Sequence, residues 1–371
     1  MSKHLHIICF DVPYPADYGG VFDLFYKLPA LQKMGVQIHL HCFVYGRKPQ
    51  PELEKYCASV HYYKRRKRLS FTVPYIVSSR KNKTLFSDLL KDDYPILMEG
   101  VHCTYLLLDK RFKGRKLFVR LHNTEFIYYR YLYQSSSHLL KKMYYCTESF
   151  LLKKYECRIV NNATFFWAVS QTDVKAYEHF FHLKNIAYLP LFLPSSWSIN
   201  SKEGGGAYCL YHGKLEVAEN EKASLWLLEN IFMHLDIPFV IAGRNPSSAL
   251  IKKVNSYPHV TLVANPSEEE MIHLISDAHI HILPSLNATG IKVKLLNALY
   301  NGRHCIVNTA AVAGTNLATL CKVTDKVKEM RQLIERLMTV PFLAEDIAQR
   351  KRLLLDEFNN DKSAAAIVEA L

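Results

Sequence analysis

Short apolar segments alternate with helical segments along this sequence, and this alternation restricts the fold more than any other feature. Residues 5–10 are apolar and predict a buried strand. Apolar spacing over 21–34 predicts a helix that ends at Gly35, and residues 36–44 predict the next strand. A strand, a helix and a second strand in this order favour a parallel sheet, because the helix returns the chain to the same edge of the sheet.

The alternation is interrupted once and then starts again. Residues 190–206 contain Pro190, Pro194 and the triplet Gly204–Gly206, a composition typical of a linker. The remaining predicted strands are 96–99, 117–121 and 165–169 before the linker, and 208–212, 239–242, 260–263, 279–283 and 304–307 after it. The remaining predicted helices are 125–133, 138–160, 223–234, 267–276 and 292–300, with one predicted to open at 170–173.

This pattern predicts an α/β protein of two Rossmann-like, doubly wound domains, and 371 residues is a fitting length for two. We expect an N-terminal domain over 1–190 and a C-terminal domain over 191–371. A final helix over about 345–371 is expected to pack back on the N-terminal domain.

Composition excludes several classes of protein. Hydrophobic residues make up 49% and charged residues 22% of the chain, which excludes a disordered protein. No apolar run approaches the roughly 18–20 residues that span a bilayer, and Met1–His6 leads into a strand without the apolar core of a signal peptide. The nine cysteines include no C-x-x-C pair, so we expect reduced thiols in a cytoplasmic protein and no zinc site.

The positive charge is concentrated in one half. Residues 1–185 contain 29 Lys and Arg against 15 Asp and Glu, whereas residues 186–371 contain 18 against 19. The basic residues gather in Lys64–Arg68, in Arg80–Lys83 and in the aromatic stretch 125–160. Such a surface fits an anionic membrane, and the alternative is a solvated basic face. We expect no nucleic-acid partner, because no nucleic-acid motif is present and the aromatic residues follow helical spacing.

Two segments place glycines where a helix is expected to begin. Gly19 and Gly20 precede the helix 21–34, and Gly290 is expected at the start of the helix 292–300. Glycine lets backbone N–H groups approach a phosphate, and a helix N-terminus attracts an anion. Lys292 and Lys294 are unfavourable beside that end of a helix unless an anion binds there. They predict a polyphosphate site, with solvated surface lysines as the alternative.

The segment Thr289–Thr309 resembles the donor-site signature of family 4 glycosyltransferases with the GT-B fold. That signature reads Gly-x-Lys-x-Lys-x-Leu-Glu-Ala, followed by a glycine, a strand and a closing glycine, here Gly314. Other segments resemble further motifs of the family in the same order: Asp17–Gly20, Arg120–Glu125, Val169–Asp173, Tyr211–Lys214 with Asn220, and Ile241–Arg244. The likeness spans about residues 5–315.

The resemblance implies a retaining hexosyltransferase that needs no metal and no cofactor. It implies a nucleotide-sugar donor, carrying mannose or glucose, and a saccharide or lipid-linked acceptor. Such enzymes build bacterial cell-surface polysaccharides in the cytoplasm or peripherally at the inner face of the membrane. The sequence also lacks an Asp-x-Asp pair, the usual metal ligands of metal-dependent enzymes.

The resemblance further implies a set of functional residues. The implied catalytic residues are His122, Lys214 and Lys294. Residues implied to bind the donor are Gly19, Gly20, Gly213, Lys222, Gly243, Gly290, Ile291 and Asn297. Residues implied to lie on the acceptor side are Asn123, Glu125 and Ser170. Fixed amides and ammonium groups would stabilise the negative charge that develops on the departing nucleoside diphosphate.

Asn297 departs from the family pattern, which has a glutamate there. Asn keeps an acceptor but loses the charge, and a charge-assisted hydrogen bond is stronger by about 1 kcal/mol. The change predicts weaker nucleotide binding or a different nucleotide preference. Two alternatives therefore stay open: a nucleotide-sugar epimerase on the same fold and a non-catalytic homologue that binds sugar nucleotides. The epimerase is disfavoured because the motif helix offers no carboxylate for proton transfer.

Overall fold

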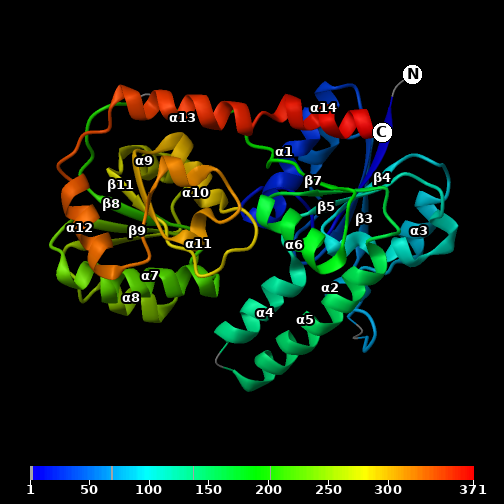
Figure 1. Cartoon of the computed structure of the whole chain (residues 1–371), viewed down its shortest axis with the longest axis horizontal. Coiled ribbons are helices and arrows are strands. Elements are labelled where there is room, and N and C mark those ends of the chain that lie inside the picture. Colours follow the sequence, from blue (N-terminus) through cyan, green and yellow to red (C-terminus); the bar gives the residue numbers. More distant parts are fainter. Residues whose placement is uncertain (1–2, 68–69, 137, 201) are drawn as a thin grey trace. The chain divides into compact units, whose positions relative to one another are not determined.

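A computed structural model describes residues 3–67, 70–136, 138–200 and 202–371. Four sequence predictions extend outside the described residues: the N-terminal segment at Met1 and Ser2, the basic cluster at Arg68, the aromatic stretch 125–160 at Ser137 and the linker at Ser201. The chain forms two compact units, shown in Figure 1. The first runs to Pro194 and includes Phe358–Leu371, and the second is Ser195–Glu357.

The first unit is built on a parallel sheet with the strand order β3-β2-β1-β4-β5-β6-β7 over the described residues. Its strands are β1 (His4–Cys9), β2 (Gln37–Val44), β3 (Ser59–Lys64), β4 (Ile96–Glu99), β5 (Leu117–Leu121), β6 (Phe165–Ala168) and β7 (Ile186–Tyr188). The order reverses between β1 and β4, which makes their carboxyl ends the expected place for a ligand.

The helices of the first unit cover this sheet and also form a separate pair. They are α1 (Gly19–Lys33), α2 (Tyr75–Ser78), α3 (Lys83–Leu89), α4 (Glu125–Ser135), α5 (Leu139–Ile159), α6 (Gln171–Phe181) and α14 (Asn360–Ala370), with 3-10 helices η1 (Pro51–Lys55), η2 (Val101–Leu108) and η3 (Lys110–Phe112). Helices α4 and α5 pack against each other and extend from the sheet, whereas α14 packs on α1 (Figure 1).

The second unit is a second parallel sheet, with the order β10-β9-β8-β11-β12-β13 over the described residues. Its strands are β8 (Cys209–His212), β9 (Phe239–Gly243), β10 (Val260–Ala264), β11 (Ile280–Ile282), β12 (His304–Val307) and β13 (Lys322–Val323). Its helices are α7 (Ala218–Asn230), α8 (Ser248–Val254), α9 (Glu268–Asp277), α10 (Val293–Asn301), α11 (Thr309–Val312), α12 (Val327–Leu337) and α13 (Ala344–Glu357), with η4 (Phe232–His234) and η5 (Leu317–Leu320).

The structure differs from the sequence analysis at the boundary between the units. Leu191, Phe192 and Leu193 are buried in the first unit, so the first residues of the expected linker belong to its core. Backbone N–H groups there donate to Asp23 and Asn360, which holds the segment in place. The single final helix expected over 345–371 is two helices, α13 in the second unit and α14 in the first.

One face of the first sheet carries histidines where aliphatic residues are usual. His6 Nδ1 lies 2.8 Å from His41 Nε2, and His6 Nε2 lies 2.9 Å from a carboxylate oxygen of Asp92. His41 Nδ1 lies 2.9 Å from the hydroxyl of Tyr63. Burial lowers the pKa of both histidines. Hydrogen bonds to neighbouring polar groups therefore allow neutral imidazoles to fill part of this core.

Candidate functional sites

In the first unit, His122 follows the carboxyl end of β5, and Glu99 is the last residue of the neighbouring β4. His122 Nε2 lies 2.9 Å from Glu99 Oε2, and the imidazole packs edge-on against Phe10 at 5.7 Å between ring centres. The His122 side chain is 10% exposed and that of Glu99 is fully buried. Because a carboxylate only accepts, the Nε2 atom donates, and Nδ1 is the acceptor of the neutral ring.

A buried network of ion pairs lies behind this histidine. Lys27 Nζ lies 2.5 Å from Glu99 Oε1 and 3.1 Å from Asp23 Oδ2, and Arg120 donates to both oxygens of Asp23. The side chains of Asp23, Lys27, Glu99 and Arg120 are all fully buried. Arg120 also donates to the carbonyls of Leu189 and Pro190. The network thus ties β4, β5 and α1 to the last segment of the unit before the boundary.

The cations Lys27 and Arg120 keep the carboxylates of Asp23 and Glu99 ionised. Burial would raise the pKa of Glu99, but Lys27 and His122 outweigh burial, and the pKa lies below its usual value. Burial acts in the same way on Asp23, where Arg120 and Lys27 bring the pKa down. Asp23, Glu99 and His122 also present ligand atoms within 4.8 Å of one another, as a metal site would. The Lys27 ammonium between both carboxylates supplies positive charge there, so the set fits an ion-pair network better than a metal centre.

The glycine pair of the first unit lies at the start of α1. Gly19 and Gly20 are the first two residues of the helix, and Tyr18 precedes them without a capping side chain. The first turn contains no acidic residue. A Cβ on Gly20 would lie 2.6 Å from the ring of Tyr18, so the tyrosine ring packs where other residues have a side chain. The start of a helix without an acidic side chain is a place where an anion can bind.

The residues predicted for the acceptor side have structural partners. Ser170 is fully buried and caps α6, with its hydroxyl accepting from the N–H of Asp173. Glu125 begins α4, is buried and hydrogen-bonds to Asn123. Burial and the neighbouring Asp173 raise the pKa of Glu125 to about 8. The structure therefore accounts for Ser170 as a helix cap, while Asn123 remains half-buried beside His122.

In the second unit, the polar groups gather around Lys294 in the first turn of α10. Lys294 Nζ donates to the hydroxyl of Tyr211 and to Oδ1 of Asn220, both at 2.9 Å, and lies 4.6 Å above the tyrosine ring. Asn220 in turn donates to the backbone carbonyl of Lys214. Burial, with Lys292 nearby, lowers the pKa of Lys294 to about 8. Both hydrogen-bond partners of this ammonium are neutral, while the charge of the Glu219 carboxylate partly offsets the effect of burial on its pKa.

The loop that precedes α10 is held by the other lysine. Lys292 Nζ donates to Oδ1 of Asn287 and to the carbonyl of Thr289, at 2.7 and 2.8 Å. Asn287 donates to Glu219, which also accepts from Ser285. Lys292 therefore stabilises the loop. Of the two lysines predicted to bind a polyphosphate, Lys294 fits that role better.

Gly290 does not lie at the helix start as expected. Helix α10 begins at Val293 and Lys292 is its N-cap residue. Gly290 is buried in the preceding loop with a φ of 62°, a left-handed conformation that favours glycine. Ile291 is half-buried between them. The turn of the loop backbone at this position needs glycine. The N–H groups of the first turn of α10 follow three residues later, from Val293 onward.

The remaining residues of the second unit that were predicted to be catalytic (Lys214) or to bind the donor differ in their surroundings. Gly243 is required by packing, because a Cβ there would lie 1.8 Å from the carbonyl oxygen of Gly213. Lys214 pairs with Glu216 at 2.9 Å, and Lys222 is exposed on α7. Asn297 accepts from Asn301 at 2.8 Å. Gly213 and Lys214 follow β8 directly and so lie close to Lys294, whereas the structure explains Gly243 and Asn297 by local contacts.

The sequence analysis missed several residues around both sites. Asp23, Lys27 and Glu99 were read only as parts of a helix and a strand, although a charged residue at the end of an apolar strand is a signal. His212, which ends β8, is also new: it is 4% exposed and its Nε2 atom has no hydrogen-bond partner among the described residues. Burial, with Lys294 nearby, lowers the pKa of His212 to about 3. A neutral imidazole thus lies close enough to Lys294 for the ammonium to lower its pKa.

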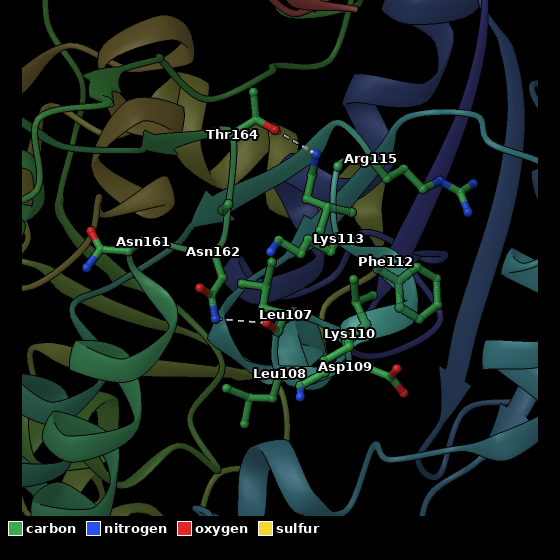
Figure 2. Close-up of a pocket in the computed structure, with 14 residues that line it drawn as sticks. Leu107, Leu108, Asp109, Lys110, Phe112, Lys113, Arg115, Asn161, Asn162 and Thr164 are labelled. Atoms are coloured by element: carbon green, nitrogen blue, oxygen red, sulfur yellow. Dashed lines mark hydrogen bonds between the residues drawn. The ribbon is translucent and has the colours of Figure 1, made fainter.

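A cavity of about 480 Å³ lies elsewhere in the first unit (Figure 2). It is lined by residues that precede β5 and β6, including Lys113, Asn162 and Thr164. Asn162 donates to the carbonyl of Leu107, and Thr164 accepts from the N–H of Leu117. These residues are at the amino ends of the strands, whereas ligands of parallel α/β sheets bind at the carboxyl ends. The cavity is therefore separate from the His122 site.

In residues 3–67, 70–136, 138–200 and 202–371, no helix combines the length and apolar character that crossing a bilayer requires. All nine cysteines are free thiols.

Comparison with known proteins gives one sequence relative. No family model matches the chain. A protein of Klebsiella pneumoniae, described as an uncharacterized 44.6 kDa protein in the cps region, is 26% identical over 336 residues. The match covers 83% of this chain and 84% of that protein.

Solved structures match almost the whole chain. Sucrose-phosphate synthase from Thermosynechococcus elongatus matches with a TM-score of 0.70 at 14% identity. The match covers 99% of this chain and 98% of the synthase chain. HepE of Anabaena, solved with UDP and glucose, has a TM-score of 0.65 at 10% identity, with coverages of 99% and 98%. WaaG, a glycosyltransferase involved in lipopolysaccharide biosynthesis, has a TM-score of 0.63 at 10% identity, with 98% of each chain covered. The chain has two Rossmann-like domains, each built on a parallel sheet. Together with these structural neighbours, they establish the GT-B glycosyltransferase fold for this chain.

Proposed function

We propose that this protein is a glycosyltransferase that transfers a hexose from a nucleotide sugar to a hydroxyl of a saccharide or lipid-linked acceptor, with retention of configuration. The observation that carries the proposal is the setting of Lys294. Its ammonium is half-buried at the N-terminus of α10, behind the left-handed Gly290, and is held by the neutral partners Tyr211 and Asn220. An ammonium and the backbone N–H groups at the start of one helix fit a diphosphate.

In this proposal the second unit stabilises the leaving group, a nucleoside diphosphate. The glycosidic bond to the diphosphate breaks while the bond to the acceptor hydroxyl forms, and negative charge grows on the phosphate oxygens. Lys294 and the N–H groups of the first turn of α10 stabilise that charge, with Lys214 as a further cation. No metal ion has a part in this proposal, and mannose or glucose is the proposed sugar.

His122 serves the transferred sugar in this proposal. Glu99 fixes which nitrogen carries the proton, so Nδ1 can accept a hydrogen bond from a sugar hydroxyl. Gly19 and Gly20 supply further backbone donors from the start of α1. The imidazole is thus an orienting group in the reaction and not the base.

The comparisons support this assignment without fixing its details. The neighbours include a glycosyltransferase and a protein solved with UDP and glucose. The relative described as a protein in the cps region fits a role in cell-surface polysaccharide synthesis. We place the protein in the bacterial cytoplasm, peripherally at the inner face of the membrane, where lipid-linked acceptors are found.

The test is incubation of the purified protein with a panel of nucleotide sugars, with and without saccharide acceptors. Slow release of free nucleoside diphosphate, lost in Lys294→Ala and kept in the control Lys253→Ala on α8, supports a transferase. Interconversion of donor sugars would instead identify an epimerase. Binding without turnover would identify a non-catalytic homologue, the outcome that Asn297 makes worth testing.

A further inference from the structure

The α4–α5 hairpin has a tip that the rest of the first unit does not cover. Its two helices pack along each other and extend from the sheet (Figure 1). The base of α5 is anchored, since Leu152, Tyr155 and Ile159 are buried. Towards the tip the anchoring ends: every residue from Leu139 to Thr147 is exposed or half-buried.

Large apolar side chains occupy this uncovered part. Leu139 is 72% and Leu140 81% exposed, and Met143 and Phe150 are each 59% exposed. Residues 139, 143 and 150 recur at helical spacing and therefore lie along one side of α5. Single exposed apolar residues are common, but an apolar stripe on one side of a helix, which Leu140 adjoins next to Leu139, marks an interaction surface.

The acidic residues of the hairpin are buried, whereas its basic residues reach the surface. Its three acidic residues, Glu125, Glu148 and Glu156, are all buried. Its basic residues are exposed or half-buried: Arg130, Lys141, Lys142, Lys153, Lys154 and Arg158. The accessible surface of the hairpin therefore combines apolar groups with positive charge only.

The lysines of α5 lie along aromatic rings. Lys154 Nζ is 4.3 Å from the centre of the Phe150 ring, and Lys142 Nζ is 5.6 Å from that of Tyr133. Both ammonium groups therefore lie over the face of an aromatic ring, with Lys154 exposed and Lys142 half-buried. A side chain in this arrangement can lie at a lipid interface, with its stem among acyl chains and its charge at the phosphates.

We propose that the α4–α5 hairpin docks on an anionic lipid bilayer, with Leu139, Leu140 and Met143 inserted into the interfacial layer. Charge complementarity selects this partner, because the hairpin presents no exposed carboxylate to repel lipid phosphates. The stripe selects a bilayer over a nucleic acid, since phosphate contacts alone would not need leucines at the tip. The inference deepens the peripheral membrane location of the proposed function by naming the surface that binds the lipid, and it does not depend on sugar transfer.

The experiment is sedimentation of the full chain with extruded vesicles of phosphatidylcholine, alone or mixed with an equal part of phosphatidylglycerol. We expect binding to the mixed vesicles and little to the neutral ones. The variant Leu139→Ser/Leu140→Ser/Met143→Ser is expected to lower the partition coefficient about 100-fold, if each side chain contributes about fivefold on partial burial. Lys141→Glu/Lys142→Glu is expected to lower it at least about tenfold.

A matched control removes the same number of exposed apolar side chains from the second unit. Ile272→Ser/Leu343→Ser/Leu355→Ser is expected to bind vesicles as the wild type does, since these side chains, about half exposed, lie outside the hairpin. Circular dichroism and thermal unfolding check that each variant is folded. Cys146, exposed on α5, offers a direct probe. In a Cys157→Ser background, an environment-sensitive dye on Cys146 should shift to the blue with mixed vesicles.

Three results would overturn the proposal. One is wild-type protein that stays in solution with mixed vesicles. The second is a triple serine variant that binds as well as the wild type, which would mean that the basic residues alone attract any polyanion. The third is a short DNA duplex that competes with vesicles at equal phosphate concentration and binds with the same dependence on Leu139 and Leu140. A lost sugar-transfer activity alone changes none of these readouts.

Discussion

Replacement of Lys27 by methionine should destabilise the first unit strongly. With His122 neutral, the buried network contains two cations and two carboxylates, and Lys27 contacts both Asp23 and Glu99. Methionine keeps most of the volume but leaves one carboxylate without a countercharge at a fully buried site. Removing one partner from a buried ion pair costs about 3–5 kcal/mol, so we expect a loss of that size in the free energy of unfolding at neutral pH.

A second substitution should recover much of this loss. In Lys27→Met/Glu99→Gln, one cation and one carboxylate are removed together, and the Asp23–Arg120 pair remains. The double variant should therefore be more stable than Lys27→Met alone. The pH dependence has a definite sign. Without Lys27, burial raises the pKa of the unpaired carboxyl above its unfolded value. The deficit of Lys27→Met against the wild type should then shrink as the pH falls and grow as it rises.

The measurement is denaturant unfolding of the first unit, followed by hydrogen exchange of β4 and β5. Lys33→Met on the same helix is the control, because Lys33 and its partner Asp361 are 67% and 54% exposed and such pairs contribute about 0–1 kcal/mol. A loss below about 1 kcal/mol for Lys27→Met, or a double variant whose loss equals the sum of the single ones, would refute the reasoning.

Three further predictions follow from other contacts. Lys294→Ala should weaken binding of a nucleoside diphosphate by about 1.5–3 kcal/mol in calorimetry. Wild-type affinity should fall as the pH rises from 7 to 9, because the ammonium, with a pKa of about 8, loses its proton; unchanged binding in either test would contradict the placement. Gly243→Ala should cost about 1–3 kcal/mol in thermal unfolding through its contact with the Gly213 carbonyl, whereas Gly205→Ala, whose nearest neighbour is 3.8 Å away, should be tolerated. Burial raises the pKa of Glu156 from 4.5 to about 8, so between these values the folded state holds a proton that the unfolded chain lacks; stability should fall by up to about 1.4 kcal/mol per unit as the pH rises towards 8, level off above 8, and fall less in Glu156→Gln.

The sequence pattern predicted elements where local signals were strong. The strands 117–121 and 304–307 have the expected bounds, and Ser267 forms the expected capping box with Glu270. The strand β3 was missed because it lies at the sheet edge, mostly outside the core and without a continuous apolar run, and β7 because it has three residues. Such short or half-exposed strands carry little apolar signal of their own.

The candidate site was predictable only in part. The Thr289–Thr309 segment pointed to Lys294, and the strand end pointed to His122. What surrounds them depends on contacts between distant residues, such as Lys27 with Glu99, 72 positions apart. Spacing could not distinguish Lys292, which braces its own loop, from Lys294, because both flank the same helix start.

The division of the first unit into two pieces of sequence has a consequence for its biosynthesis. Helix α14 contacts α1, and Asn360 exchanges hydrogen bonds with Leu193 in both directions. On the ribosome, the sheet from β1 to β7 emerges long before its last helix is translated. The second unit, continuous in sequence, can finish folding first, and the first stays open along α1 until the tail leaves the exit tunnel. Nascent chains stalled just before Phe358 should therefore be cleaved by protease in the first unit.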